Sequence, residues 1–110
     1  MKYGLRDSML QSITNIFIKY PKIEKAILYG SRAKGNYKTG SDIDLTLLGE
    51  KLNIQDLNKI YMELDNLYLP YSFDISIFEK LENKELIEHI NRVGIVIYDK
   101  INNDKSLSSQ

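Results

Sequence analysis

The stretch from Lys25 to Leu48, KAILYGSRAKGNYKTGSDIDLTLL, decides the fold of this chain. It opens with a short apolar run, continues through a segment rich in glycine and polar residues, and closes with a second apolar run. Short apolar runs bounded by turn residues predict strands, so we expect strands over Lys25–Tyr29 and Asp42–Leu48. Between them we expect a turn at Gly30 and a short helix that begins near Ser31.

Amphipathic helices are predicted on both sides of this stretch. In three segments, apolar residues recur at helical spacing and follow a residue suited to cap a helix N-terminus. We expect these caps at Asp7, Asn53 and Asn83. Gly94 follows the third segment, and we expect it to end that helix with a positive φ angle.

The complete element order indicates one α/β domain. Two further apolar runs, Tyr71–Phe78 and Ile95–Tyr98, are typical of strands. Helices therefore alternate with strands, which predicts an α/β (α+β) fold with a small mixed sheet and helices packed on one side of it. We expect this domain to cover residues 1–98. Residues 99–110 are polar and rich in Ser and Asn, and we expect them to form a flexible tail.

Composition excludes several classes of function. The 110 residues include 15 Lys and Arg, 15 Asp and Glu, one His and no Cys. Disulfides, cysteine-ligated zinc and thiol nucleophiles are therefore excluded, and a formal net charge of zero argues against strong nucleic-acid binding. No apolar run approaches the roughly 20 residues that span a bilayer, so we expect a cytoplasmic protein without a membrane partner. The one histidine, His89, is expected at the surface or facing a partner.

Three aspartates are candidate metal ligands. Side chains two positions apart on a strand share a face, so Asp42 and Asp44 are expected to project together, away from the core. Asp74 interrupts the apolar run of a later strand and would join them if the two strands are neighbours. Clustered carboxylates repel each other unless a cation lies between them, and Mg²⁺ is held by carboxylates together with substrate phosphates. The pattern favours two Mg²⁺ ions and in-line phosphoryl or nucleotidyl transfer.

The segment before these aspartates is suited to phosphate. Gly30 follows a strand directly, and glycine allows the backbone to approach a ligand closely. Free N–H groups at a helix start favour an anion, and the Ser31 hydroxyl adds a donor. The same segment carries Arg32, Lys34 and Lys38 and no acidic residue. A nucleoside triphosphate needs both these donors for its phosphates and carboxylates for its magnesium.

These residues carry a resemblance to a known family. Gly30 and Ser31, ten further residues, and then Asp42-Ile43-Asp44 form a G-S-x10-D-x-D pattern. The pattern resembles the signature of the DNA polymerase β-like nucleotidyltransferase superfamily. By motif and element order, the chain is similar to the minimal nucleotidyltransferases (MNT) found in HEPN/MNT toxin–antitoxin pairs.

The resemblance implies a role for each candidate residue. The three aspartates would hold Mg²⁺, and Asp74 is also a candidate general base for the acceptor hydroxyl. Gly30 and Ser31 would hold the β- and γ-phosphates of the nucleotide, with Arg32 or Lys34 nearby. The reaction implied is transfer of a nucleoside monophosphate, AMP from ATP in the leading interpretation, to a hydroxyl with release of pyrophosphate.

The resemblance also implies a helical partner protein. In HEPN/MNT pairs the nucleotidyltransferase is the antitoxin, a protein adenylyltransferase that silences the HEPN toxin by modifying a tyrosine. Other minimal members work with a separate helical substrate-binding subunit on a small-molecule acceptor. A third interpretation is a non-catalytic antitoxin that binds nucleotide or blocks its partner sterically. The sequence leaves these alternatives open, along with the identity of the acceptor.

Overall fold

The computed structural model describes residues 1–102 of the chain and confirms the predicted order of helices and strands. One short 3-10 helix, η1, was not predicted. The elements are α1 (Asp7–Ile18), β1 (Lys25–Tyr29), α2 (Gly30–Lys34), β2 (Ile43–Leu48), α3 (Ile54–Asp65), β3 (Phe73–Ile77), η1 (Phe78–Lys80), α4 (Lys84–Val93) and β4 (Ile95–Asp99).

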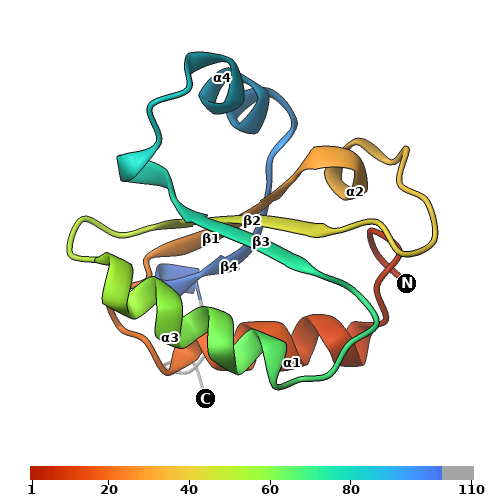
Figure 1. Cartoon of the computed structure of the whole chain (residues 1–110), viewed down its shortest axis with the longest axis horizontal. Helices are drawn as coiled ribbons and strands as arrows, with labels where there is room; N and C mark the ends of the chain where they lie inside the picture. Colours follow the sequence, from red (N-terminus) through yellow and green to blue (C-terminus); the bar gives the residue numbers. More distant parts are fainter. Residues whose placement is uncertain (103–110) are drawn as a thin grey trace.

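The four strands form one mixed sheet in the order β3-β2-β1-β4. Strand β1 pairs antiparallel with both β2 and β4, whereas β2 and β3 are parallel. Helices α1 and α3 cover one face of the sheet, and α2 and α4 lie on the other (Figure 1). The expectation that the helices pack on one side is therefore wrong for α2 and α4, which both contact β1.

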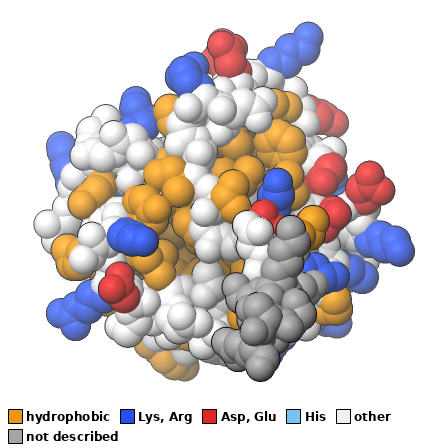
Figure 2. Space-filling view, turned by 180° about the vertical axis from the view of Figure 1, so that it is seen from behind, with side chains coloured by type: hydrophobic (Ala, Val, Ile, Leu, Met, Phe, Trp, Pro, Cys, Tyr) orange, Lys and Arg blue, Asp and Glu red, His pale blue; other side chains and the backbone are white. Residues whose placement is uncertain are grey.

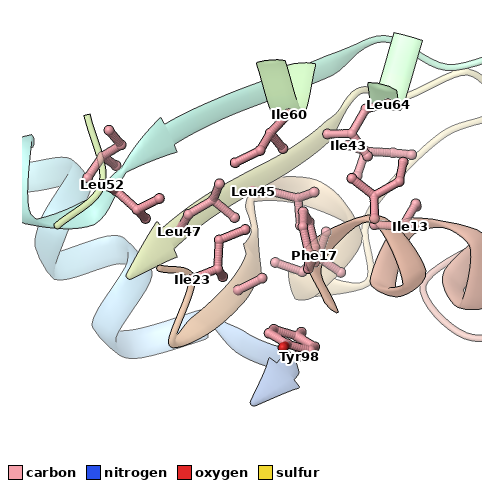
Figure 3. Close-up of a cluster of buried hydrophobic side chains, with 14 of the residues drawn as sticks. Ile13, Phe17, Ile23, Ile43, Leu45, Leu47, Leu52, Ile60, Leu64 and Tyr98 are labelled. Carbon is pink, nitrogen blue, oxygen red and sulfur yellow. The ribbon is translucent and has the colours of Figure 1, made fainter. Parts of the chain in front are cut away.

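The hydrophobic core lies between the sheet and the α1–α3 layer (Figure 3). Alternate residues of β2 enter it, because successive side chains on a strand point to opposite faces. Each fully buried Leu or Ile contributes about 1.5–3 kcal/mol to stability. The most buried side chains of this core include Leu5, Ile13, Phe17, Ile23, Leu28, Ile43, Leu45, Leu47, Ile60 and Leu64.

Two of the predicted helix caps are confirmed. The Asn53 side chain accepts a hydrogen bond from the Asp56 N–H, and the Asp56 carboxylate accepts one from the Asn53 N–H. This reciprocal pair satisfies two N–H groups that the helix itself leaves without partners. The Asn83 side chain accepts from the Leu86 N–H in the same way at the start of α4.

Two other expectations about helix ends are wrong. Asp7 is the first residue of α1, and Arg6 occupies the cap position without a side-chain hydrogen bond. Gly94 ends α4 as expected, but its φ angle is −61°, so it does not use the left-handed region. Glycine is required there for space, because a Cβ atom would overlap the Ile90 carbonyl oxygen and the Ile27 side chain.

The fold extends slightly beyond the expected domain boundary at residue 98. Strand β4 includes Asp99, and the next residue, Lys100, donates its backbone N–H to the Glu24 carbonyl. The Lys100 ammonium also donates to the Pro21 carbonyl. These bonds tie the start of the expected tail to the segment before β1, and residues 103–110 of that tail lie outside the described residues.

The surface carries charges of both signs, in keeping with the zero net charge of the chain. Figure 2 shows apolar side chains toward the middle of one face, with charged side chains of both signs mainly around its rim. Within residues 1–102, no helix is long and apolar enough to cross a bilayer.

Candidate active site

Three side chains from three adjacent strands form a row across the face of the sheet that α2 and α4 flank. Tyr29 of β1 lies opposite Asp44 of β2, and Asp44 lies opposite Asp74 of β3. Residues directly opposite each other in a ladder project to the same face. The predicted proximity of Asp44 and Asp74 is therefore confirmed, because their strands are neighbours.

The next row of the sheet supports this one. The Ser76 hydroxyl donates a 2.9 Å hydrogen bond to the Thr46 hydroxyl oxygen. Thr46 is completely buried. These hydroxyls lie two residues further along β2 and β3 than the aspartates, and on the same face. The bond joins the two strands directly behind Asp44 and Asp74.

Asp42 lies just outside the strand. The sequence predicted a strand from Asp42, but β2 begins at Ile43, and Asp42 is exposed in the loop that precedes it. The Asp42 carboxylate still lies near enough to Asp44 to raise the pKa of that residue. The structure thus brings all three predicted aspartates to one end of β2 and β3, with Asp44 in the middle.

The row concentrates negative charge. Burial raises the pKa of Asp44 to about 6, and the charges of Asp74 and Asp42 add to the effect, while Arg32 opposes it. Burial also raises the pKa of Tyr29, with further increases from Asp74 and Asp44 and an opposing contribution from Ser76. A carboxylate that is costly to ionise in the free protein gains most from a bound cation.

The carboxylates have the chemistry for a magnesium ion that is shared with a substrate. In the described part of the chain, none of the three aspartates forms an ion pair. Within residues 1–102, no three His, Cys, Asp or Glu side chains are grouped so that they could hold a metal ion without ligands from elsewhere, and the three aspartates are no exception. Mg²⁺ normally keeps one or two carboxylates and takes its other ligands from water and substrate phosphates. Unpaired carboxylate oxygens that need further ligands fit that coordination.

The turn from β1 into α2 lies against this row. Gly30 opens α2 with a φ angle of +74°, a conformation that glycine adopts readily and other residues rarely do. A Cβ atom at Gly30 would overlap the Oδ2 atom of Asp44. Ser31 follows in the first turn, and its hydroxyl makes no hydrogen bond to any residue in the part of the chain described. The turn therefore lies against a carboxylate and carries a free hydroxyl on its next residue.

His89 is the residue that sequence reasoning missed. Its Nε2 atom accepts a 3.1 Å hydrogen bond from the Gly30 N–H. Its ring packs edge-on against Tyr29, with the ring centroids 6.1 Å apart at 81°. His89 of α4 is half-buried, so it is less exposed than the expected surface position, and the alternative that it faces a partner stays a prediction. One signal was available, because His89 lies three residues after the apolar Leu86 and therefore flanks the buried stripe of the helix.

Arg32 is turned into the protein. It is 2% exposed, and its Nε and Nη2 atoms donate to the Ser41 carbonyl at 3.1 and 2.7 Å. Its Nη1 atom donates to the Tyr3 carbonyl at 2.9 Å. The guanidinium also lies against the rings of Tyr71 and Tyr37, at 4.5 and 5.4 Å from their centroids. These contacts join the N-terminal segment to the loop before β2.

The other two predicted cations remain at the surface. Lys34 and Lys38 are exposed and form no ion pair with any described residue. Lys38 lines a cavity of about 570 Å³ between the N-terminal segment, the loop before β2 and the segment before β3. Arg6 and Arg32 also line this cavity, and its described lining contains no acidic residue. Positive side chains therefore line this cavity, whereas the negative charges of Asp44 and Asp74 lie on the sheet.

Known proteins share this architecture. Residues 11–103 match the family described as "Polymerase beta, Nucleotidyltransferase". A protein of Methanocaldococcus jannaschii, named as a candidate protein adenylyltransferase, is 28% identical over 79 residues, which cover 69% of this chain and 80% of the relative.

Two solved structures show the same fold. A toxin–antitoxin structure with AMP-PNP has a TM-score of 0.69 at 18% identity and covers 87% of this chain and 77% of that chain. A Shewanella oneidensis complex of a tri-AMPylated HEPN toxin with its MNT antitoxin has a TM-score of 0.66 at 16% identity. That alignment covers 92% of this chain and 78% of the other.

Proposed function

The chain belongs to the Polymerase beta nucleotidyltransferase family, and from this membership we propose that it transfers AMP from ATP to a hydroxyl group of a partner protein, in a reaction that depends on Mg²⁺. The partner we propose is a helical HEPN-type toxin, which makes this chain the antitoxin of a HEPN/MNT-type pair. The observation that carries the chemistry is the opposed, unpaired pair Asp44 and Asp74 beside the Gly30 turn.

The carboxylates would bind the metal that accompanies ATP. Asp44, with the raised pKa, and Asp42 would supply oxygen ligands from one side, and Asp74 would supply one from the neighbouring strand. When bound, Mg²⁺ neutralises charge on the phosphates and stabilises the attacking and leaving oxygens in an in-line displacement. Binding would also relieve the repulsion among the three carboxylates.

Asp74 would receive the acceptor. It is exposed and lies on an edge strand, so a hydroxyl from another molecule can reach it. Its carboxylate would accept the proton of that hydroxyl, and the oxygen would form a bond to the α-phosphorus. The bond from the α-phosphorus to the bridging oxygen would break, and pyrophosphate would leave with the electron pair.

The Gly30 turn would hold the other phosphates. The free hydroxyl of Ser31 would be one donor, and exposed Lys34 adds a positive charge at the end of the same short helix. Arg32 would affect this site indirectly, because its guanidinium holds the loop that leads to Asp42. In this proposal, Ser31 and Lys34 would contact phosphate and Arg32 would give structural support.

The choice of partner and of nucleotide rests on relatives. The solved neighbours are toxin–antitoxin structures, one containing AMP-PNP and another a HEPN toxin that carries AMP. The curated relative is named for protein adenylyltransfer. These names support AMP as the transferred group and a protein as the acceptor.

The test uses ATP labelled at the α-phosphate, Mg²⁺, this chain and a HEPN protein encoded beside it. We expect label on the partner with the wild type, no label with Asp44→Asn, and no label when EDTA replaces Mg²⁺. Label on a small molecule supplied by a helical subunit would contradict the choice of acceptor. Neutralisation of the partner by Asp44→Asn at wild-type level would show that steric binding is sufficient.

A further inference from the structure

We infer that His89 is a positioning residue for nucleotide binding: its imidazole holds the Gly30 peptide in the conformation that presents Ser31 to the phosphates. The inference rests on the proposed function and adds to it a residue of α4, 59 positions away from Gly30 in the chain. No motif considered above contains His89.

The hydrogen bond defines the state of the imidazole. A backbone N–H can only donate, so Nε2 of His89 must be the acceptor in the 3.1 Å contact with Gly30. In a neutral imidazole the other nitrogen, Nδ1, then carries the proton. The edge-on contact with the Tyr29 ring holds the imidazole plane in this orientation. The neutral imidazole therefore has a single tautomer in this contact, and its acceptor nitrogen has a fixed direction.

The Gly30 peptide needs such a partner. Glycine has more backbone freedom than any other residue, so a turn built on it is flexible unless its groups are held. On one side, Asp44 leaves no room for a Cβ atom at this position. On the other side, His89 takes the N–H. Between them the turn is preorganised, and preorganisation lowers the entropic cost of binding a ligand.

This assignment also divides the roles of the two residues in the turn. The Gly30 N–H is already engaged by His89, so it is not the donor that meets the nucleotide. The Ser31 hydroxyl, which makes no hydrogen bond to any described residue, is available for that contact. Gly30 contributes the shape of the turn, and His89 maintains that shape.

Two substitutions separate a hydrogen-bonding role from simple packing. In His89→Gln the amide oxygen can reach the place of Nε2, whereas His89→Leu retains apolar bulk without an acceptor. We expect His89→Leu to raise the Kd for a non-hydrolysable ATP analogue with Mg²⁺ about tenfold, the factor that corresponds to one hydrogen bond of about 1.4 kcal/mol. His89→Gln should stay within about threefold of the wild type.

Titration calorimetry on the full chain measures these constants, and thermal unfolding of the same samples reports folding. A purely structural role would lower the melting temperature of both variants without separating their affinities. Equal affinities for wild type and His89→Leu would overturn the inference. A tighter Kd for His89→Leu would overturn it as well, because the imidazole would then compete with phosphate for the Gly30 N–H.

A spectroscopic measurement tests the bond without any nucleotide. An N–H···N hydrogen bond transmits scalar coupling between its two nitrogens, and the chain has one histidine, so the signal has a single assignment. We expect this coupling between Gly30 and His89 in ¹⁵N-labelled wild type, and its absence would overturn the inference. If the coupling is present but the wild type binds no ATP analogue, the proposed function fails, and with it the role in binding.

Discussion

Gly30 and Asp44 lie so close together that a methyl group on the glycine would overlap the Oδ2 atom of the carboxylate. The two residues come from different elements, the start of α2 and the start of β2, and each restricts the other. The turn can approach the carboxylate only because position 30 has no side chain. Their contact makes the G-S turn and the acidic row one structural unit.

Replacement of that glycine should therefore affect activity more than stability. In Gly30→Ala the new methyl displaces the Asp44 carboxylate, and we expect nucleotide transfer to fall at least about 100-fold. Gly35→Ala is the matched control, because Gly35 also has a positive φ angle but has no atom near its Cβ position. Both variants should lose about 1–2 kcal/mol of stability from backbone strain. Equal losses of transfer in the two variants would contradict this explanation.

Asp44→Asn should lower activity without lowering stability. Asp44 is costly to ionise, because burial and two neighbouring carboxylates raise its pKa to about 6. We expect transfer to fall at least about 100-fold, while the free energy of unfolding in EDTA at neutral pH stays unchanged or rises by up to about 1 kcal/mol. Asp65→Asn, at the exposed end of α3, makes the same change in charge and should alter neither quantity. A clear loss of stability in Asp44→Asn would count against the repulsion described here.

Arg32→Lys tests whether the buried guanidinium is a structural group. A lysine cannot replace a fork that donates to both the Ser41 and Tyr3 carbonyls, so we expect a loss of about 2–3 kcal/mol in urea unfolding. Arg92→Lys is the matched control. Arg92 is exposed and has only a 4.0 Å ion pair with Glu88, so its change should stay within about 0.5 kcal/mol. Unchanged stability with weaker ATP binding in Arg32→Lys would instead favour direct phosphate contact.

Tyr20 should make the stability of the folded protein fall at alkaline pH, and one substitution should remove this pH dependence. Burial and a hydrogen bond to the Glu63 carboxylate raise the pKa of Tyr20 to about 12 in the folded protein, above the ordinary value of 10.0. The raised pKa favours folding while the phenol is neutral. This contribution is complete below pH 10 and is lost as the pH rises through about 12.

Tyr20→Phe removes both the hydrogen bond and the titration. We expect it to cost about 1 kcal/mol at neutral pH and to make the stability less sensitive to pH between 10 and 12. Tyr61→Phe is the control, because its exposed hydroxyl makes no hydrogen bond to any residue in the described part of the chain. Denaturant unfolding at pH 8 and pH 11 gives the comparison. An equal pH dependence in all three proteins would contradict the role of Tyr20.

Local signals were sufficient to predict most of the fold. The strand over Lys25–Tyr29 was predicted at its observed bounds, because an apolar run ends there at a glycine. Asn53 and Asn83 marked helix starts correctly, because a side-chain oxygen that meets free N–H groups is a local interaction. The proximity of Asp44 and Asp74 was predicted for the case that their strands are neighbours, since an acid inside an apolar strand is costly to bury without a partner.

The errors concern contacts between distant segments. His89 was placed at the surface because its own helix is mostly polar, and only the packing of α4 beside α2 brings it to Gly30. The phosphate contact expected for Arg32 stays a prediction, but its bonds to the Ser41 and Tyr3 carbonyl oxygens were not foreseen, because a guanidinium binds carbonyl oxygens and phosphates with the same donors. The second helix layer was missed because polar residues on one face of β2 suggested an uncovered face.

The alternation of side chains along β2 between the two faces of the sheet has a consequence for the evolution of this protein. Ile43, Leu45 and Leu47 face the core, whereas Asp44 and Thr46 lie between them on the other face. Selection for folding and selection for chemistry therefore act on interleaved codons of the same short segment. A saturation scan of β2, scored once by cellular abundance and once by nucleotide transfer, should show loss of abundance at Ile43, Leu45, Leu47 and the buried Thr46, and loss of transfer alone at Asp44. Substitutions at Asp44 can then change the chemistry with little effect on folding.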